Sequence, residues 1–199
     1  QDVQFFIYNQ INFRTSNSID DDASSNASSQ AMNGWSVGGT LNITIGRSLN
    51  NPSSSWYSGF GDYIFLLKQM MSPQAKTEAH EIGHFFTMPH TFYGWEGLDA
   101  EADYGGQNVP SSIGSGWGSF SPEAVPRTGV QANCTNAGDG FCGTEADYFS
   151  SRTNCPYIVT AKDPYGNALD PDESNIMSYA YDACVNTFSS DQKTAIAMD

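Results

Sequence analysis

The sequence predicts one α+β domain, and three observations support this. Runs rich in β-branched and aromatic residues in the first 67 residues favour the strands of a sheet. A helix is predicted over about 73–86, because Ser72 is a good N-cap and Pro73 suits the first helical position. From residue 91 the chain is rich in glycine, serine and aromatic residues without periodicity, which indicates a long irregular region.

The strand segments before the helix are 3–8, continued at 11–13 after a polar break, then 41–45 and 63–67. In the second of these, Leu41, Ile43 and Ile45 alternate with polar residues, which is the period of a half-buried strand. A loop is expected at 50–55. The acidic triplet at 20–22 predicts a solvated polar loop that leads into a short helix near 27–32; calcium binding is the less favoured alternative.

The charge excludes two classes of partner. Twenty-two acidic and eight basic side chains give a formal net charge of −14, which repels nucleic acid and anionic membranes. No apolar run approaches the roughly 18 residues that a membrane span needs. Gln1 is not an initiator methionine, so we expect a chain processed from a longer precursor.

The chemistry is concentrated in residues 80–90, which contain all three histidines of the chain. On a helix, His80 and His84 lie one turn apart on the same face, and His90 follows beyond the helix end. Three neutral imidazoles plus an open position are typical of catalytic zinc. Glu81 lies about 100° round the helix from His80 and suits a general base. The alternative is a helix with coincidental histidines.

The cysteines form an even set in the second half of the chain: Cys134, Cys142, Cys155 and Cys184. Without a Cys-x-x-Cys pair, they indicate two disulfides in an exported protein, and buried free thiols are the alternative. Four cysteines allow three connectivities, and the sequence does not choose among them.

The zinc motif, with its third histidine six residues after the second, resembles that of the metzincin metallopeptidases. Residues 175–179, with Met177 and Tyr179, resemble the methionine turn of these enzymes. Segments 90–96, 137–142 and 182–184 narrow the resemblance to secreted bacterial, cytophagalysin-type members of the pappalysin-like family. The resemblance covers most of the chain and is best from residue 35 onward.

The resemblance implies a zincin fold: a twisted mixed sheet and active-site helix in an upper lobe (about 1–90), and an irregular, disulfide-stapled lower lobe (about 91–199). It implies that strand 63–67 edges the cleft, although an ordinary buried strand is equally compatible with the residues. It favours pairing Cys134 with Cys142 and Cys155 with Cys184. Ordinary turn chemistry is the favoured explanation of Asp139, Glu145 and Asp147, and structural calcium, in the manner of the family, is the alternative.

Two roles come only from the resemblance. Met177 would pack beneath the zinc without binding it, which is compatible with a plain core methionine. Tyr179 would donate a hydrogen bond to the reaction's oxyanion; a structural tyrosine is the alternative. The chain departs from the family at Gly143–Glu145, where Asp-Thr-Pro is usual, and at Thr87, where the family has glycine. We expect a glycine-like turn with positive φ at Thr87, against a different turn with negative φ.

We therefore expect a secreted, monomeric zinc endopeptidase that hydrolyses protein or peptide substrates. His80, His84 and His90 would bind zinc, and Glu81 would accept the proton of the attacking water. A catalytically inactive binding or adhesion module and a zinc hydrolase of non-protein substrates are the alternatives. Near the C-terminus, Ser189 and Gln192 form a capping-box pattern that predicts a helix from Ser190 to about Met198.

Overall fold

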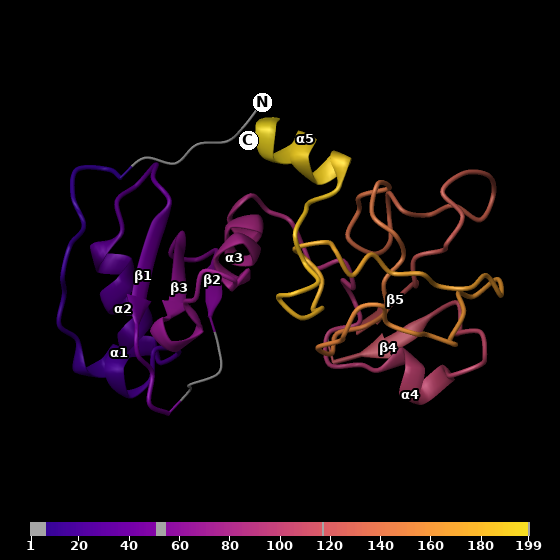
Figure 1. Ribbon diagram of the computed structural model, residues 1–199, viewed down its shortest axis with the longest axis horizontal. Coiled ribbons are helices and arrows are strands. Elements are labelled where there is room, and N and C mark those ends of the chain that lie inside the picture. The colour runs from indigo at the N-terminus through magenta and orange to yellow at the C-terminus, as the bar shows by residue number, and fades with distance from the viewer. Residues whose placement is uncertain (1–6, 51–54, 117, 199) are drawn as a thin grey trace. The chain divides into compact units, whose positions relative to one another are not determined.

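Five consecutive apolar residues, Tyr63–Leu67, form strand β3 of the computed structural model, and all five are buried. β3 pairs in parallel with β1 (Asn42–Gly46) and antiparallel with β2 (Trp56–Ser58), so the sheet order is β1-β3-β2 (Figure 1). The structure describes residues 7–50, 55–116 and 118–198. At this level the prediction of an α+β fold with a mixed sheet is confirmed.

The chain packs as two compact units, Gln1–Thr87 and Met88–Asp199. Besides the sheet, the described residues of the first unit form α1 (Asn17–Asp21), α2 (Asn26–Trp35), the 3-10 helix η1 (Lys68–Met70) and α3 (Thr77–Phe85). Those of the second unit form α4 (Ala100–Tyr104), a hairpin of β4 (Ile113–Ser115) and β5 (Gly118–Phe120), and α5 (Ser190–Met198). Each unit has its own hydrophobic core.

One face of the sheet packs on α1 and α2. Alternate β3 side chains, Tyr63, Phe65 and Leu67, form a buried cluster with Ile19, Ala23 and Met32. The predicted helix near 27–32 is confirmed as α2, and it begins where the Ser25 hydroxyl accepts a hydrogen bond from the Ser28 amide at 3.2 Å. The acidic triplet is not a loop, because 20 and 21 belong to α1.

β1 lies where the alternation predicts a strand, but the buried face is the opposite one. Ile43 is 39% exposed and Ile45 is 55% exposed. The helices cover the other face of β1: a Cβ at Gly46 would lie 3.2 Å from the Phe65 ring and 3.4 Å from Ile19. Periodicity identifies two faces of a strand, but which face is buried depends on where the helices pack.

The expectation that strand 63–67 edges the cleft is wrong. In the sheet formed by the described residues, β3 lies between β1 and β2, and β2 lies at one end of the order. β2 is therefore the edge strand next to α3, which contacts both β2 and β3. The expectation came from the family resemblance, and β2, with only the three residues Trp56–Ser58, was not identified from the sequence.

The first predicted strand is not confirmed. Residues 3–6 lie outside the described residues, as do 51–54 of the predicted loop. Residues 7–13 are irregular, and Phe13 is 94% exposed. The prediction of a buried strand at Ile11–Phe13 is therefore wrong for the structure as described.

The helix that bears the histidines begins later than predicted. α3 starts at Thr77, and its N-cap, Lys76, makes no side-chain capping bond. Ser72 instead closes a single separate turn, in which its hydroxyl and carbonyl oxygens accept the Ala75 amide at 3.1 and 3.0 Å. The Ser-Pro signal is thus used by the turn before the helix.

The second unit is largely irregular, as predicted, and packs around aromatic residues such as Phe92, Trp95 and Tyr148. Disulfides join Cys134 to Cys142 and Cys155 to Cys184, which is the pairing that the family resemblance favoured. None of the helices within the described ranges has the length and apolar character that crossing a bilayer requires.

α5 begins with the predicted capping box. The Ser189 hydroxyl accepts the Gln192 amide at 3.2 Å, and the Gln192 side chain accepts the Ser189 amide at 2.9 Å. The same Gln192 oxygen accepts a hydrogen bond from the Asn175 side chain at 3.0 Å, and Gln192 is fully buried. The cap of α5 therefore also supports the turn that contains Met177.

We predict that Gln192→Ala destabilises the protein by about 2–3 kcal/mol, because it leaves the Asn175 side chain and the Ser189 amide without their acceptor. Thr194→Ala, an exposed position on the same helix, is the control and should change stability by no more than about 0.5 kcal/mol. Urea denaturation measures both. Equal stability of the two variants would show that Gln192 does not support the turn.

Candidate metal centre

The three histidines form a group that could bind a metal ion. His80 and His84 lie one turn apart on α3, with ring centroids 4.8 Å apart, and His90 follows beyond the helix. One ligand atom from each of the three lies within 4.8 Å of the other two. In the part of the chain that the structure describes, no other group of three or more histidine, cysteine or acidic side chains is arranged in this way.

The donor set fits zinc. Zn–N bonds of about 2.0–2.1 Å in a tetrahedral site place ligand nitrogens roughly 3.3 Å apart, so only small rotations of the half-buried rings are needed from separations of up to 4.8 Å. All four cysteines are in disulfides, and no thiolate is left to make a closed structural site. Three imidazoles leave one tetrahedral position open for a water or a substrate.

The helix ends in the glycine-like turn that the sequence predicts. Phe86, the C-cap, donates its amide to the Ile82 carbonyl at 3.1 Å, and Thr87 donates its amide to the His84 carbonyl at 2.9 Å. Thr87 has φ +60°, which is unusual for a β-branched residue. Thr87, three residues after His84, takes the left-handed conformation just past the end of α3, and His90 follows three residues later.

Contacts within the second unit fix the segment around His90. The His90 ring stacks on Phe92 at 4.6 Å between centroids and meets the edge of Tyr179 at 4.8 Å. The next residue, Thr91, donates its amide to the Met177 carbonyl at 3.2 Å and its hydroxyl to Asp147 at 2.6 Å. The third histidine is therefore held by both a ring stack and hydrogen bonds to buried groups.

The methionine turn is a hydrogen-bonded loop in the core of the second unit. Asn175 is fully buried and accepts the Met177 amide at 2.9 Å with its side-chain oxygen. Met177 is also fully buried, which agrees with both interpretations of this residue. Tyr179 lies beside the third histidine, where the family resemblance expects it, although its ring contacts alone do not assign a chemical role.

Glu81 is buried beside the edge strand. It accepts a hydrogen bond from the backbone of Tyr57 in β2. Burial raises the pKa of Glu81 to about 7, and the bond from Tyr57 opposes this rise. Glu81 is not a member of the three-histidine group, so the structure separates it from the candidate ligands, as its place on the helix predicts.

The sequence analysis did not identify Glu96, which contacts a candidate ligand. Its carboxylate lies 3.3 Å from Nδ1 of His90 and accepts the Gly94 amide at 2.8 Å. Burial acts to raise the pKa of Glu96, but hydrogen bonds from His90 and from backbone amides prevail and lower it. An acidic residue six positions after a histidine, beyond a glycine, is the weak sequence signal that was available.

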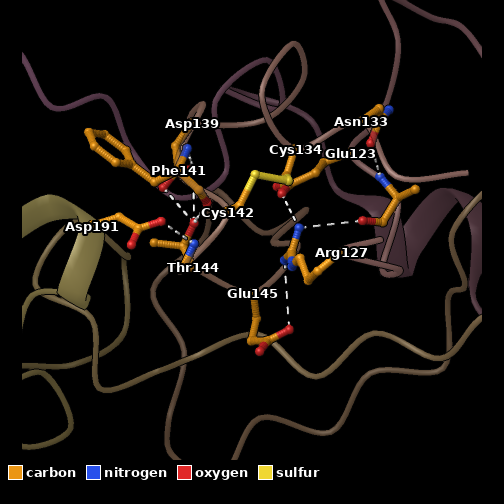
Figure 2. Close-up of a disulfide and its surroundings, with 12 residues drawn as sticks. Glu123, Arg127, Asn133, Cys134, Asp139, Phe141, Cys142, Thr144, Glu145 and Asp191 are labelled. Atoms are coloured by element: carbon orange, nitrogen blue, oxygen red, sulfur yellow. Dashed lines mark hydrogen bonds and ion pairs between the residues drawn. A yellow bond between two sulfur atoms is a disulfide. The ribbon is translucent and has the colours of Figure 1, made fainter. Parts of the chain in front are cut away.

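The carboxylates for which calcium was considered are engaged with internal donors. Asp139 accepts the Phe141 amide and the Thr144 hydroxyl at 2.9 Å each, and Asp147 accepts Thr91 and the Phe149 amide (Figure 2 shows the part around Asp139). Burial raises the pKa of Asp139 to about 6 and that of Asp147 to about 7. Calcium binding remains a prediction.

A neighbouring buried acid is paired with arginine instead. Glu123, with 1% of its side chain exposed, accepts a hydrogen bond from Arg127, which also lies 3.7 Å from Glu145 (Figure 2). Gly138, with φ +60°, crosses directly over this carboxylate: a Cβ there would lie 2.2 Å from Glu123 Oε2, so only glycine fits. Burial raises the pKa of Glu123, and the Arg127 charge opposes the rise.

Comparisons with known proteins give no further constraint. No model of a known protein family matches the chain, and no characterised protein and no solved structure matches it either. The assignment of this site therefore depends on its own residues.

We predict that Thr87→Gly maintains or raises thermal stability. Removing the strain of a β-branched residue at positive φ should raise the free energy of unfolding by about 1–2 kcal/mol. The greater entropy of glycine in the unfolded chain should lower it by about 0.5–1 kcal/mol. Thr77→Gly in the first turn of α3 is the control and should destabilise by about 0.5–1 kcal/mol. Calorimetry distinguishes the two, and a clear drop in melting temperature for Thr87→Gly would contradict the strained turn.

Burial raises the pKa of Glu123 to about 8, and we predict that the stability lost in Arg127→Met grows as the pH rises above about 8, where the ionised Glu123 lacks its counter-charge. The loss should shrink at pH 5, since removing Arg127 raises the pKa of Glu123 further and a protonated Glu123 needs no partner. Arg152→Met removes an exposed pair with Asp182 and should cost no more than about 1 kcal/mol. Similar losses for both variants in urea denaturation would refute this role of Arg127.

Proposed function

We propose that the protein is a secreted zinc-dependent endopeptidase. The observation that supports this most strongly is the grouping of His80, His84 and His90 within 4.8 Å, with the buried Glu81 next to a candidate ligand on the same helix. Three neutral nitrogen donors with an open position suit catalysis better than structural binding. An adjacent carboxylate outside the ligand set is what metal-assisted hydrolysis requires of a base.

Zinc, Glu81 and Tyr179 each have a separate role in the proposed reaction. Bound zinc supplies a Lewis acid, which lowers the pKa of water toward about 7 and polarises a carbonyl group. Glu81 accepts the proton of the attacking water and passes it to the departing amine. Tyr179, next to His90, donates a hydrogen bond to the oxyanion that forms at the scissile carbonyl, and losing such a donor costs about 100-fold or more in rate.

We propose a metzincin fold of the pappalysin-like kind for this chain. Support comes from the mixed sheet with its antiparallel edge strand, from the histidines on α3, and from the buried methionine turn hydrogen-bonded to the residue after His90. The two disulfides of the second unit support an oxidising, extracellular location. A protein or peptide substrate is proposed because the histidine motif and the methionine turn resemble those of metallopeptidases.

We predict that Glu81→Ala retains zinc and fold but loses about 10²–10⁴-fold in kcat on a peptide substrate. Glu78→Ala is the matched control, because Glu78 is an exposed acid in the first turn of the same helix. Zinc content, circular dichroism and peptide cleavage are measured on each variant. Cleavage by Glu81→Ala at the wild-type rate would rule out the proposed mechanism.

Casein digestion with and without a zinc chelator separates the proposed function from its alternatives. An endopeptidase digests casein, stops when the chelator is added and recovers with zinc. A binding module or a hydrolase of other substrates leaves casein intact under all conditions. If casein stays intact but the protein contains one zinc ion per chain, the proposed metal centre stands and the proposal of a protein substrate is wrong.

A further inference from the structure

The Glu96 carboxylate is hydrogen-bonded to the His90 imidazole. Its Oε1 atom lies 3.3 Å from His90 Nδ1, and its Oε2 atom accepts the Gly94 amide at 2.8 Å. The second bond matters because it prevents the carboxylate from rotating away from the ring. Among the ion pairs of the described residues, Glu96 has no lysine or arginine partner, so its charge faces the imidazole.

The loop from His90 to Glu96 folds back on itself, so that Glu96 lies next to His90. Successive turns are closed by the Tyr93 amide to the His90 carbonyl at 3.1 Å and by the Trp95 amide to the Phe92 carbonyl at 2.9 Å. Gly94 has φ +98°, and a Cβ there would lie 2.9 Å from the Phe120 ring, so no other residue fits this path.

Buried aromatic packing keeps the loop in place. Trp95 is 2% exposed and stacks on Tyr148 with centroids 4.6 Å apart, while Phe120 meets its ring edge at 5.4 Å. Glu96 therefore follows directly after an anchored residue, and its position does not depend on a flexible surface loop.

The imidazole needs such a contact to present a defined nitrogen. Stacking on Phe92 and an edge contact with Tyr179 fix the plane of the His90 ring, but these contacts do not decide which nitrogen carries the proton. When a carboxylate accepts a hydrogen bond from the Nδ1–H group, the proton stays on Nδ1 and the lone pair is on Nε2, on the far side of the ring. A neighbouring carboxylate also makes the ring a stronger donor to a metal ion.

We infer that Glu96 is a positioning residue for the metal centre: it fixes the tautomer and orientation of His90 and thereby strengthens zinc binding. The inference rests on the zinc site of the proposed function and goes beyond it, because it assigns a role to a residue that neither binds the ion nor takes part in proton transfer. Removing such a partner typically weakens metal affinity by about 10–100-fold.

The test is the zinc affinity of the full chain, measured by competition with a chromophoric zinc chelator. Glu96→Gln is the informative variant, since its amide keeps the size of the side chain but cannot accept bonds from both His90 and the Gly94 amide. Glu101→Gln is the matched control: Glu101 also accepts backbone amides, from Thr160 and Ala161 at 2.9 Å each, but contacts no histidine. Thermal unfolding of each metal-free variant is recorded in parallel.

We expect zinc affinity to fall about 10–100-fold in Glu96→Gln and less than about 2-fold in Glu101→Gln, with metal-free Glu96→Gln losing no more thermal stability than metal-free Glu101→Gln. Wild-type zinc affinity in Glu96→Gln would overturn the inference while leaving the proposed function intact. An equal loss of zinc affinity in both variants would overturn it too, because the loss would then not depend on the contact with His90. If the unchanged chain binds no zinc, the proposed metal centre itself fails.

Discussion

The site depends on one constraint, which is that α3 can supply only two histidines to a metal ion. One turn of helix brings His80 and His84 together, but a third imidazole on the same face would project elsewhere along the axis. The third ligand must come from a chain that has left the helix. Thr87 makes this exit in a left-handed conformation at φ +60°, and three residues later the chain reaches His90.

The hydrogen bonds around His90 explain why so much buried polar structure surrounds the methionine turn. The Thr91 amide binds the Met177 carbonyl, the Met177 amide binds Asn175, and Asn175 binds Gln192 of α5. Each of these groups is buried, so each missing bond would cost about 1–3 kcal/mol. These hydrogen bonds support His90, a candidate ligand, in a unit that has few helices and strands. The two disulfides cross-link the same unit.

The sequence predicted best where local chemistry decides the outcome. The capping box of Ser189 and Gln192 and the strand at 63–67 follow from short-range rules of hydrogen bonding and burial. The positive φ of Thr87 was expected only because the family that the chain resembles has glycine at that position. Spacing of the histidines likewise fixed which side chains could share an ion. The disulfide pairing did not follow from the residues alone, because four cysteines are compatible with three arrangements until a fold is assumed.

The errors arose where tertiary packing decides. Ile43 and Ile45 alternate correctly, yet only the position of α1 and α2 makes theirs the exposed face of β1. Trp56–Ser58 was not identified as a strand because three residues are too few to show a period, and the family resemblance gave the edge position to β3. Glu96 reaches His90 only because Gly94 and the packing of Trp95 fold the loop back on itself, and no local pattern encodes that return.

The central claim is that three histidine nitrogens bind one zinc ion and leave a position open. X-ray absorption at the zinc edge of the zinc-loaded chain tests it most directly, since the method counts ligands and distinguishes nitrogen from sulfur. The structure predicts three imidazole nitrogens at about 2.0–2.1 Å and one further oxygen ligand. A shell containing sulfur, or one with fewer than three imidazoles, would contradict the claim.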